Sequence, residues 1–184
     1  PGPDRSPAWS PDGGRIAYIT ETDVAHAPYD VPMLAVIEPG SRPTILTGTL
    51  DRGVSGPLFS ADGNSIFFRV DDSGERHHAR ISTRGGAVDR VISGPLSVSG
   101  ATRGGEDVLV ALISKPHEPG NLYLLESGGE LRKLTRNNDE MLDGVDLANV
   151  VNVRFPSADG TEIEGFFYKP LGFQEGRRYP TILR

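Results

Sequence analysis

The sequence predicts an all-β fold made of short antiparallel strands. Three observations support this prediction. Gly and Pro, which resist the interior of a helix, supply 23 and 15 of the 184 residues. Segments 7–20 and 57–70 repeat one another, and strand-like runs alternate with Gly-containing turns through most of the chain. The length allows one ordinary domain and part of a second.

The repeated segment predicts a strand, a tight turn and a second strand. Residues 7–20 read PAWSPDGGRIAYIT and residues 57–70 read PLFSADGNSIFFRV. Asp12 and Asp62 can accept hydrogen bonds from nearby backbone N–H groups, and the glycine after each can adopt a positive φ. These turns, and the similar SADG at 157–160, also offer carboxylates to calcium. A calcium loop needs several oxygen ligands at fixed spacing, which these segments lack, so structural turns are predicted.

A second pattern completes the repeating unit. Segments 33–47, 78–93 and 121–135 each contain a strand, a glycine turn and another strand. A weaker copy of the first pattern occupies 96–113, where the strand 107–113 remains and the Asp-Gly turn is missing. The unit is therefore about 45 residues long with four strands, which is typical of a β-propeller blade. We predict about three four-stranded blades, which form a partial propeller over residues 1–148.

The apolar positions favour blades over an open sandwich. Runs such as 16–19 and 66–68 are apolar at successive positions, as in strands that are buried on both faces, whereas a sandwich would more often alternate. Trp9 and Phe59, just before the turns, are expected to anchor each blade against its neighbour. Three blades cannot close a ring. The chain is therefore expected to be part of a larger protein, or to pair with a second copy through its exposed blade edges.

The last part of the chain differs from the repeats. The acidic residues of 139–146 predict a solvated linker. Val151 to Phe155 alternates, Asp159-Gly160 marks a turn and the run 163–168 returns, so a hairpin is predicted. Thr181 to Leu183 is expected to begin another strand. We divide the chain into a propeller domain, 1–148, and the start of a second domain, 149–184.

The combination of these parts resembles a known family. Repeats of the SPDG type followed by SADGTEIEGFFYKPLGFQEGRRYPTIL at 157–183 resemble the prolyl oligopeptidase family of serine peptidases, and the acylaminoacyl-peptidase-like branch is the most similar. The resemblance implies a β-propeller followed by an α/β-hydrolase domain, of which residues 149–184 would be the opening hairpin and first core strand. It also implies a parent enzyme that hydrolyses short or N-acylated peptides, with the propeller gating access to a Ser-His-Asp triad.

The triad itself is not expected among these residues. No serine has the G-x-S-x-G frame of a nucleophile elbow; Ser55 follows Gly53 but precedes Pro57 at the position of the second glycine. We therefore assign no catalytic, cofactor-binding or metal-binding residue and expect this chain alone to be inactive. The alternative is a TolB-type propeller that binds proteins without catalysis, because such propellers share the blade motif. The segment 157–183 favours the peptidase.

The histidines and two of the arginines are predicted to be surface or structural residues. His77 and His78 would point to opposite faces of a strand, so they are expected to be exposed strand or turn residues rather than metal ligands. His26, in the loop 21–32, and His117 are expected to decorate loops. Arg76 and Arg103 are expected on the solvated surface.

Composition limits the partners and the compartment. A net charge of −6 and a pI near 5.2 argue against nucleic-acid binding. The absence of Cys rules out disulfides and thiolate metal sites, and no apolar run is long enough to span a bilayer. The expected partner is a short peptide, with no cofactor and no membrane. A cytoplasmic location is expected, with a periplasmic or secreted one left open, and Pro1 is not expected to be the native N-terminus.

Overall fold

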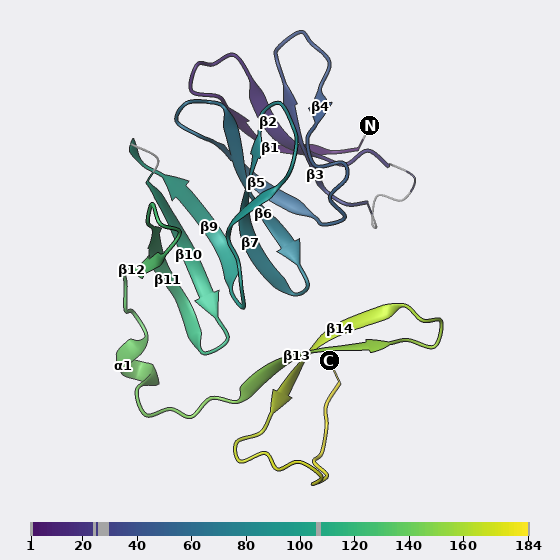
Figure 1. Ribbon diagram of the computed structural model, residues 1–184, viewed down its shortest axis with the longest axis vertical. Helices are drawn as coiled ribbons and strands as arrows, with labels where there is room; N and C mark the ends of the chain where they lie inside the picture. Colours follow the sequence, from purple (N-terminus) through teal and green to yellow (C-terminus); the bar gives the residue numbers. More distant parts are fainter. Residues whose placement is uncertain (1, 24, 26–29, 106–107, 184) are drawn as a thin grey trace. The chain divides into compact units, whose positions relative to one another are not determined.

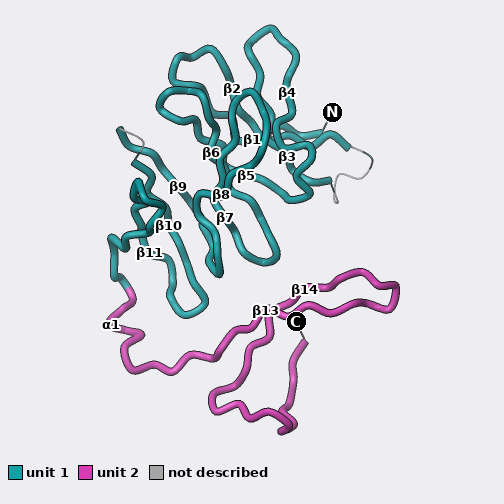
Figure 2. The backbone as a smooth tube through the Cα atoms, viewed as in Figure 1, with its two compact units in different colours: residues 1–137 teal, residues 138–184 magenta. Residues whose placement is uncertain are grey.

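The computed structural model describes residues 2–23, 25, 30–105 and 108–183. The chain forms two compact units, residues 1–137 and 138–184, which are described separately (Figure 2). The all-β prediction is confirmed: within the described residues the only α-helix is α1, Asp139–Leu142. No helix in those ranges is long and apolar enough to cross a membrane. His26 and Asp107 lie outside the described residues.

The first unit consists of antiparallel meanders in which consecutive strands are neighbours (Figure 1). Within the described residues there are three, which we call meanders A, B and C. Their strands are β1 (Asp4–Trp9), β2 (Ile16–Thr20), β3 (Met33–Ile37) and β4 (Thr44–Ile45) in A; β5 (Val54–Phe59), β6 (Ser65–Asp72), β7 (Glu75–Ser82) and β8 (Asp89–Ile92) in B; and β9 (Ser97–Arg103), β10 (Leu109–Lys115), β11 (Glu118–Leu125) and β12 (Leu131–Lys133) in C. A parallel bridge between Arg76 and Ser97 joins B to C.

The repeat extends to backbone irregularities. β1 and β5 both shift register at matching positions, Ser6-Pro7 and Gly56-Pro57, and β9 shifts register as well. Ser6 has φ 53° and Gly56 has φ 60°, so both adopt the left-handed conformation that a β-bulge can require. The two segments thus repeat a backbone geometry as well as a sequence pattern.

The Asp-Gly turns form as predicted. Asp62 accepts hydrogen bonds from the Ser60 hydroxyl at 2.5 Å and from the Asn64 backbone N–H at 3.0 Å. Asp12 accepts the same two kinds of bond, and Gly13 and Gly63 both have φ 70°. The Ser60 hydroxyl is the main cause that lowers the pKa of Asp62 to about 2. These carboxylates therefore hold their own turns closed.

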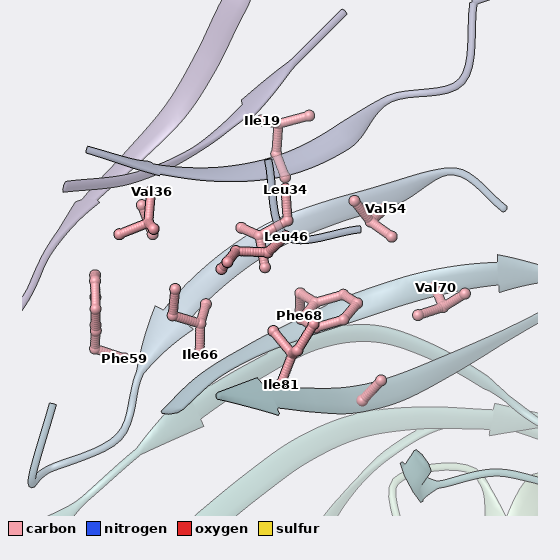
Figure 3. Close-up of a cluster of buried hydrophobic side chains, with 12 residues drawn as sticks. Ile19, Leu34, Val36, Leu46, Val54, Phe59, Ile66, Phe68, Val70 and Ile81 are labelled. Carbon is pink, nitrogen blue, oxygen red and sulfur yellow. The ribbon is translucent and has the colours of Figure 1, made fainter. Parts of the chain in front are cut away.

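Meanders A and B share one apolar core (Figure 3). It includes Ile19 and Leu34 from A and Phe59, Ile66 and Phe68 from B, and all five side chains are buried. β5 contacts β1, β2 and β3, so the face of B that carries Phe59 is covered by A. A separate, smaller cluster forms the core between B and C, and its members are Ile92, Leu96, Val98, Leu109, Ala111, Ile113 and Tyr123.

The predicted anchoring role is confirmed for Phe59 and wrong for Trp9. Phe59 is 7% exposed, whereas Trp9 is 60% exposed. Both residues end the first strand of a meander, opposite Ile66 and Ile16 respectively. The difference arises because meander A covers Phe59, whereas no described segment covers the matching face of A.

The second unit contains the predicted hairpin. Strands β13 (Asn149–Pro156) and β14 (Glu162–Lys169) pair without a register shift, and Asp159 closes their turn through bonds from Ser157 and Thr161. The predicted linker 139–146 includes α1. The strand expected to begin at Thr181 is absent from the described residues 181–183, where Ile182 and Leu183 are exposed. A strand needs a neighbour to pair with, and these residues have none in the described structure.

Truncation of the two matching aromatics should separate a covered site from an uncovered one. We expect Phe59→Ala to lower the free energy of unfolding by about 3–5 kcal/mol, because it leaves a cavity between A and B. In the 184-residue chain by itself, Trp9→Ala should cost less than about 1 kcal/mol, because its side chain is mostly solvated. Urea denaturation followed by circular dichroism measures both. Equal losses would show that Trp9 is covered after all.

Candidate functional site

A cavity of about 150 Å³ lies between meanders B and C. Strands β5, β6 and β7 form one wall and β9 forms the other. Its lining residues are Gly56, Leu58, Arg69, His78, Gly100 and Ala101. Because the wall combines short apolar surfaces with a guanidinium and an imidazole, this cavity is the candidate functional site.

The internal repeat shows that the polar pair in this wall is unusual. Each meander has a cross-strand pair at the same position, three residues after the start of the apolar run in its second strand. The pairs are Ile19–Leu34 in A, Arg69–His78 in B and Leu112–Leu122 in C. Ile19 and Leu34 are 1% and 0% exposed in the core between A and B. An apolar pair is therefore compatible with the fold at this position, and among the three meanders only B has a polar pair, Arg69–His78.

His78 is buried and carries no charge at neutral pH. It is 1% exposed, and its ring stacks on Phe67 with the centroids 5.9 Å apart. Burial lowers the pKa of His78 to about 4, and the charge of Arg69 contributes to the shift. Neither ring nitrogen has a hydrogen-bond partner in the part of the chain that the structure describes. The prediction of an exposed His78 is wrong because meander C covers this face of β7.

Arg69 crosses the cavity wall close to the bulge of β5. Its Nη1 donates to the Ser99 carbonyl of β9. A Cβ on Gly56 would lie 3.2 Å from Nη2, so the absence of a side chain there leaves room for the guanidinium. Arg69 makes no ion pair with any described residue, and none of the cavity's lining residues is acidic. The cavity thus presents a positive charge without a fixed counter-ion.

Arg103 also belongs to this interface, which corrects its prediction as a solvated surface residue. Its Nη1 donates to the Phe59 carbonyl at 3.0 Å, and its guanidinium lies 4.9 Å from the centre of the Phe67 ring. Burial lowers the pKa of Arg103. The contacts explain why a charged side chain is tolerated: its polar end reaches a carbonyl and its flat face covers an aromatic ring. Arg76 is a partly exposed surface residue, as predicted, and pairs with Asp71 at 2.5 Å.

His77, adjacent to His78 and on the opposite face of β7, lies in a network of paired charges. Its Nε2 lies 3.1 Å from Glu75, and Asp72 accepts bonds from Arg52 and Arg90, each at 2.9 Å. The pKa of Asp72 is raised by burial and lowered by both arginines, and the net direction is down. The side chain of His77 is largely buried, so its predicted exposure is also wrong. This network ties the β6–β7 turn to β8. His117 is exposed in the β10–β11 turn, as predicted.

A second polar cluster centres on Glu118 in meander C. Its carboxylate accepts hydrogen bonds from the Tyr123 hydroxyl at 2.6 Å and from Lys133 at 2.6 Å, and Lys115 lies 3.6 Å away. Burial alone would raise the pKa of Glu118, but these donors and charges outweigh it and lower the pKa to about 2. Sequence reasoning did not single out Glu118. Because every group here is paired, the cluster stabilises the outer strands of C.

The chain is similar to known proteins over a part of their length. No family model matches the chain. Among curated proteins, the chain is 24% identical to the uncharacterized peptidase YuxL of Bacillus subtilis over 127 residues, 69% of this chain and 19% of the relative. It is 25% identical to the probable dipeptidyl-peptidase 5 of Arthroderma benhamiae over 97% of this chain and 25% of the relative. The chain thus spans a quarter or less of the length of these curated relatives.

Solved structures show a similar fold. An acylaminoacyl peptidase in complex with Z-Gly-Gly-Phe-chloromethyl ketone matches with a TM-score of 0.76 and 21% identity over 92% of this chain and 25% of that one. A putative TolB from Agrobacterium tumefaciens matches with a TM-score of 0.59 and 21% identity over 92% of this chain and 60% of that one. The β-propeller domain of the Trilobed protease from Pyrococcus furiosus matches at 0.57 and 20% identity over 70% of this chain and 37% of that one.

The fold is therefore one that β-propeller domains share. The curated relatives and the structural neighbours together support a relationship to peptidases of the prolyl oligopeptidase family, over a part of those proteins.

The low pKa of Glu118 predicts a pH dependence of stability. A carboxylate whose pKa is lower in the folded state stabilises that state above its unfolded value, here 4.5, and the contribution is lost as the pH falls toward 2. We expect Glu118→Gln to unfold more easily than the parent chain at pH 7 and to lose less stability between pH 4.5 and pH 2. Urea midpoints across this range measure the difference, and Glu130→Gln, on an exposed turn, controls for the lost charge. Parallel curves for Glu118→Gln and the parent would contradict the assignment.

Proposed function

We propose that this chain is the propeller part, with the beginning of the catalytic domain, of a serine peptidase of the prolyl oligopeptidase family. Meanders A, B and C are then blades within residues 1–148, and residues 149–184 open an α/β-hydrolase domain with the β13–β14 hairpin. The observation that carries the proposal is the match to the probable dipeptidyl-peptidase 5 over 97% of this chain, which includes both units. The higher TM-score of the acylaminoacyl peptidase than of TolB, 0.76 against 0.59, favours the same proposal.

The uncovered faces of the first unit support a partial propeller. Leu112 and Leu122 are 39% and 40% exposed, although the matching pair Ile19–Leu34 is fully buried between A and B. Trp9 is exposed on the opposite side of the series, although the matching Phe59 is buried. Apolar positions that are buried at one repeat and exposed at another indicate that a further blade, or a second copy of the chain, covers them.

In the proposed parent enzyme the blades gate the active site. The chemistry would be acyl transfer by a Ser-His-Asp triad, supplied by residues outside this chain. Blades whose strands are buried on both faces form a stiff cover, which would admit short or N-acylated peptides and exclude folded proteins. Such a cover would also keep water from the reacting groups. In this proposal the chain acts by positioning and selecting the substrate and contributes no catalytic residue.

The second candidate is a TolB-type module that binds proteins without catalysis. The match to the putative TolB, which covers 92% of this chain and 60% of that protein, favours it. The two candidates differ in the segments that they require beyond the β13–β14 hairpin. The peptidase requires a His-Gly-Gly segment and a G-x-S-x-G elbow further along the encoded protein, whereas the binding module requires neither.

Hydrolysis assays distinguish the two candidates. We expect the intact encoded protein to release nitroaniline from an acetyl-alanyl or peptidyl nitroanilide, and a serine-reactive phosphonate to abolish that turnover. The 184-residue chain alone should show no turnover above buffer. An intact protein that neither hydrolyses these substrates nor reacts with the phosphonate would favour the binding module. Phosphonate-sensitive turnover by the chain alone would refute its predicted inactivity.

A truncation on the free face of C tests whether another blade covers it. In the intact protein we expect Leu122→Ala to lower the free energy of unfolding by about 2–5 kcal/mol, as a buried leucine does. Leu34→Ala is the matched reference, because Leu34 holds the same position in the covered pair of A. Chemical denaturation of both variants measures the losses. If Leu122→Ala were nearly neutral while Leu34→Ala cost several kcal/mol, meander C would be a free end.

A further inference from the structure

We propose that the cavity between meanders B and C binds a small carboxylate, with Arg69 as its anchor and the buried ring of His78 as part of its wall. The site is formed wholly by residues of this chain and does not depend on the proposed peptidase activity. Arg69 comes from β6 and His78 from the adjacent β7, and β9 closes the cavity from the other side.

The internal repeat argues that this polar pair serves a ligand. At the same position in meander A, the fold places Ile19 and Leu34 and buries both completely. Burying an imidazole whose nitrogens lack partners costs stability, and an apolar side chain of similar size would avoid that cost. A local departure from the packing rule that the rest of the fold follows is typical of a functional site.

The chemistry of the wall selects a carboxylate. A guanidinium is a planar fork that can donate two parallel hydrogen bonds to the two oxygens of a carboxylate. In Arg69, Nη1 already donates to the Ser99 carbonyl, which holds the fork in place, while Nη2 and Nε face the bulge at Gly56. Both ring nitrogens of His78 are buried, so the imidazole forms part of the wall and the hydrogen bonds to the ligand come from Arg69.

The size and charge of the cavity fit a small acid. Its volume of about 150 Å³ equals that of an engineered protein cavity that accepts benzene. Leu58 and Ala101 provide apolar surface for a short aliphatic chain, and the lining includes no carboxylate that would repel the ligand.

The carboxylate group can belong to a free small acid or to the carboxyl terminus of a short peptide. Propionate is the probe for the first source and acetyl-glycyl-glycine for the second, and their neutral amides are the matched controls. Isothermal titration calorimetry on the full chain should detect propionate binding in the low millimolar range, with propionamide binding at least about tenfold more weakly. Binding of acetyl-glycyl-glycine but not its amide would extend the site to peptide termini.

Substitutions then locate the site. Arg69→Met should weaken propionate binding by about tenfold to a hundredfold, because it removes the charged fork and keeps the apolar stem. Arg132→Met is the control and should leave the affinity unchanged, because Arg132 lies on β12 and pairs with Glu126. The double variant Arg69→Ile with His78→Leu copies the pair of meander A. It should unfold at the same or a higher temperature than the parent and bind no propionate.

The double variant keeps the test decisive if the single variant folds poorly. The proposal is overturned if propionate does not bind, if propionamide binds equally well, or if Arg69→Met retains the parent affinity. None of these measurements involves peptide hydrolysis, so the carboxylate site and the proposed peptidase function can fail independently.

Discussion

The structure of the first unit depends on one constraint: its meanders carry apolar side chains on both faces, so each face needs a neighbour. Between A and B the requirement is met by Ile19, Leu34 and Phe59, which lie in one continuous core. The free faces of A and C show the same requirement unmet, with Trp9 on one and Leu112–Leu122 on the other exposed. Stacking of sheets therefore follows from the residue pattern, and it determines which side chains end up buried.

The interface between B and C meets the same constraint with different chemistry. Its apolar cluster includes Val98 and Ile113, but charged and polar groups occupy the positions that are apolar between A and B. Arg103 is accommodated by a carbonyl and an aromatic ring, so it costs little. Arg69 likewise donates one guanidinium N–H to a carbonyl, whereas the imidazole of His78 has no hydrogen-bond partner among the described residues. The two arginines differ in position, because Arg69 lines the cavity and Arg103 covers the Phe67 ring.

The proposed peptidase function would give the stiffness of these interfaces a role. In the proposed parent enzyme, a propeller that covers the active site would have to stay rigid while short peptides pass, and paired sheets with tightly held turns would supply that rigidity. The Asp-Gly turns contribute because each carboxylate accepts hydrogen bonds from a hydroxyl and a backbone N–H of its own loop. A small-carboxylate site between two blades would add a place where a ligand could stabilise the same interface, since binding to the folded state alone raises its stability.

The sequence by itself determined the strands of the first unit, the Asp-Gly turns and the four-stranded period, because these depend on contacts between residues close in the chain. It also predicted the β13–β14 hairpin, whose turn repeats the same serine and aspartate contacts. It could not distinguish Trp9 from Phe59, which share one motif but differ in whether a neighbouring sheet covers them. For the same reason it misplaced His78 and Arg103. Only tertiary structure decides such burial, because the covering residues come from another repeat, and it is this packing that brings Arg69, His78 and β9 around one cavity.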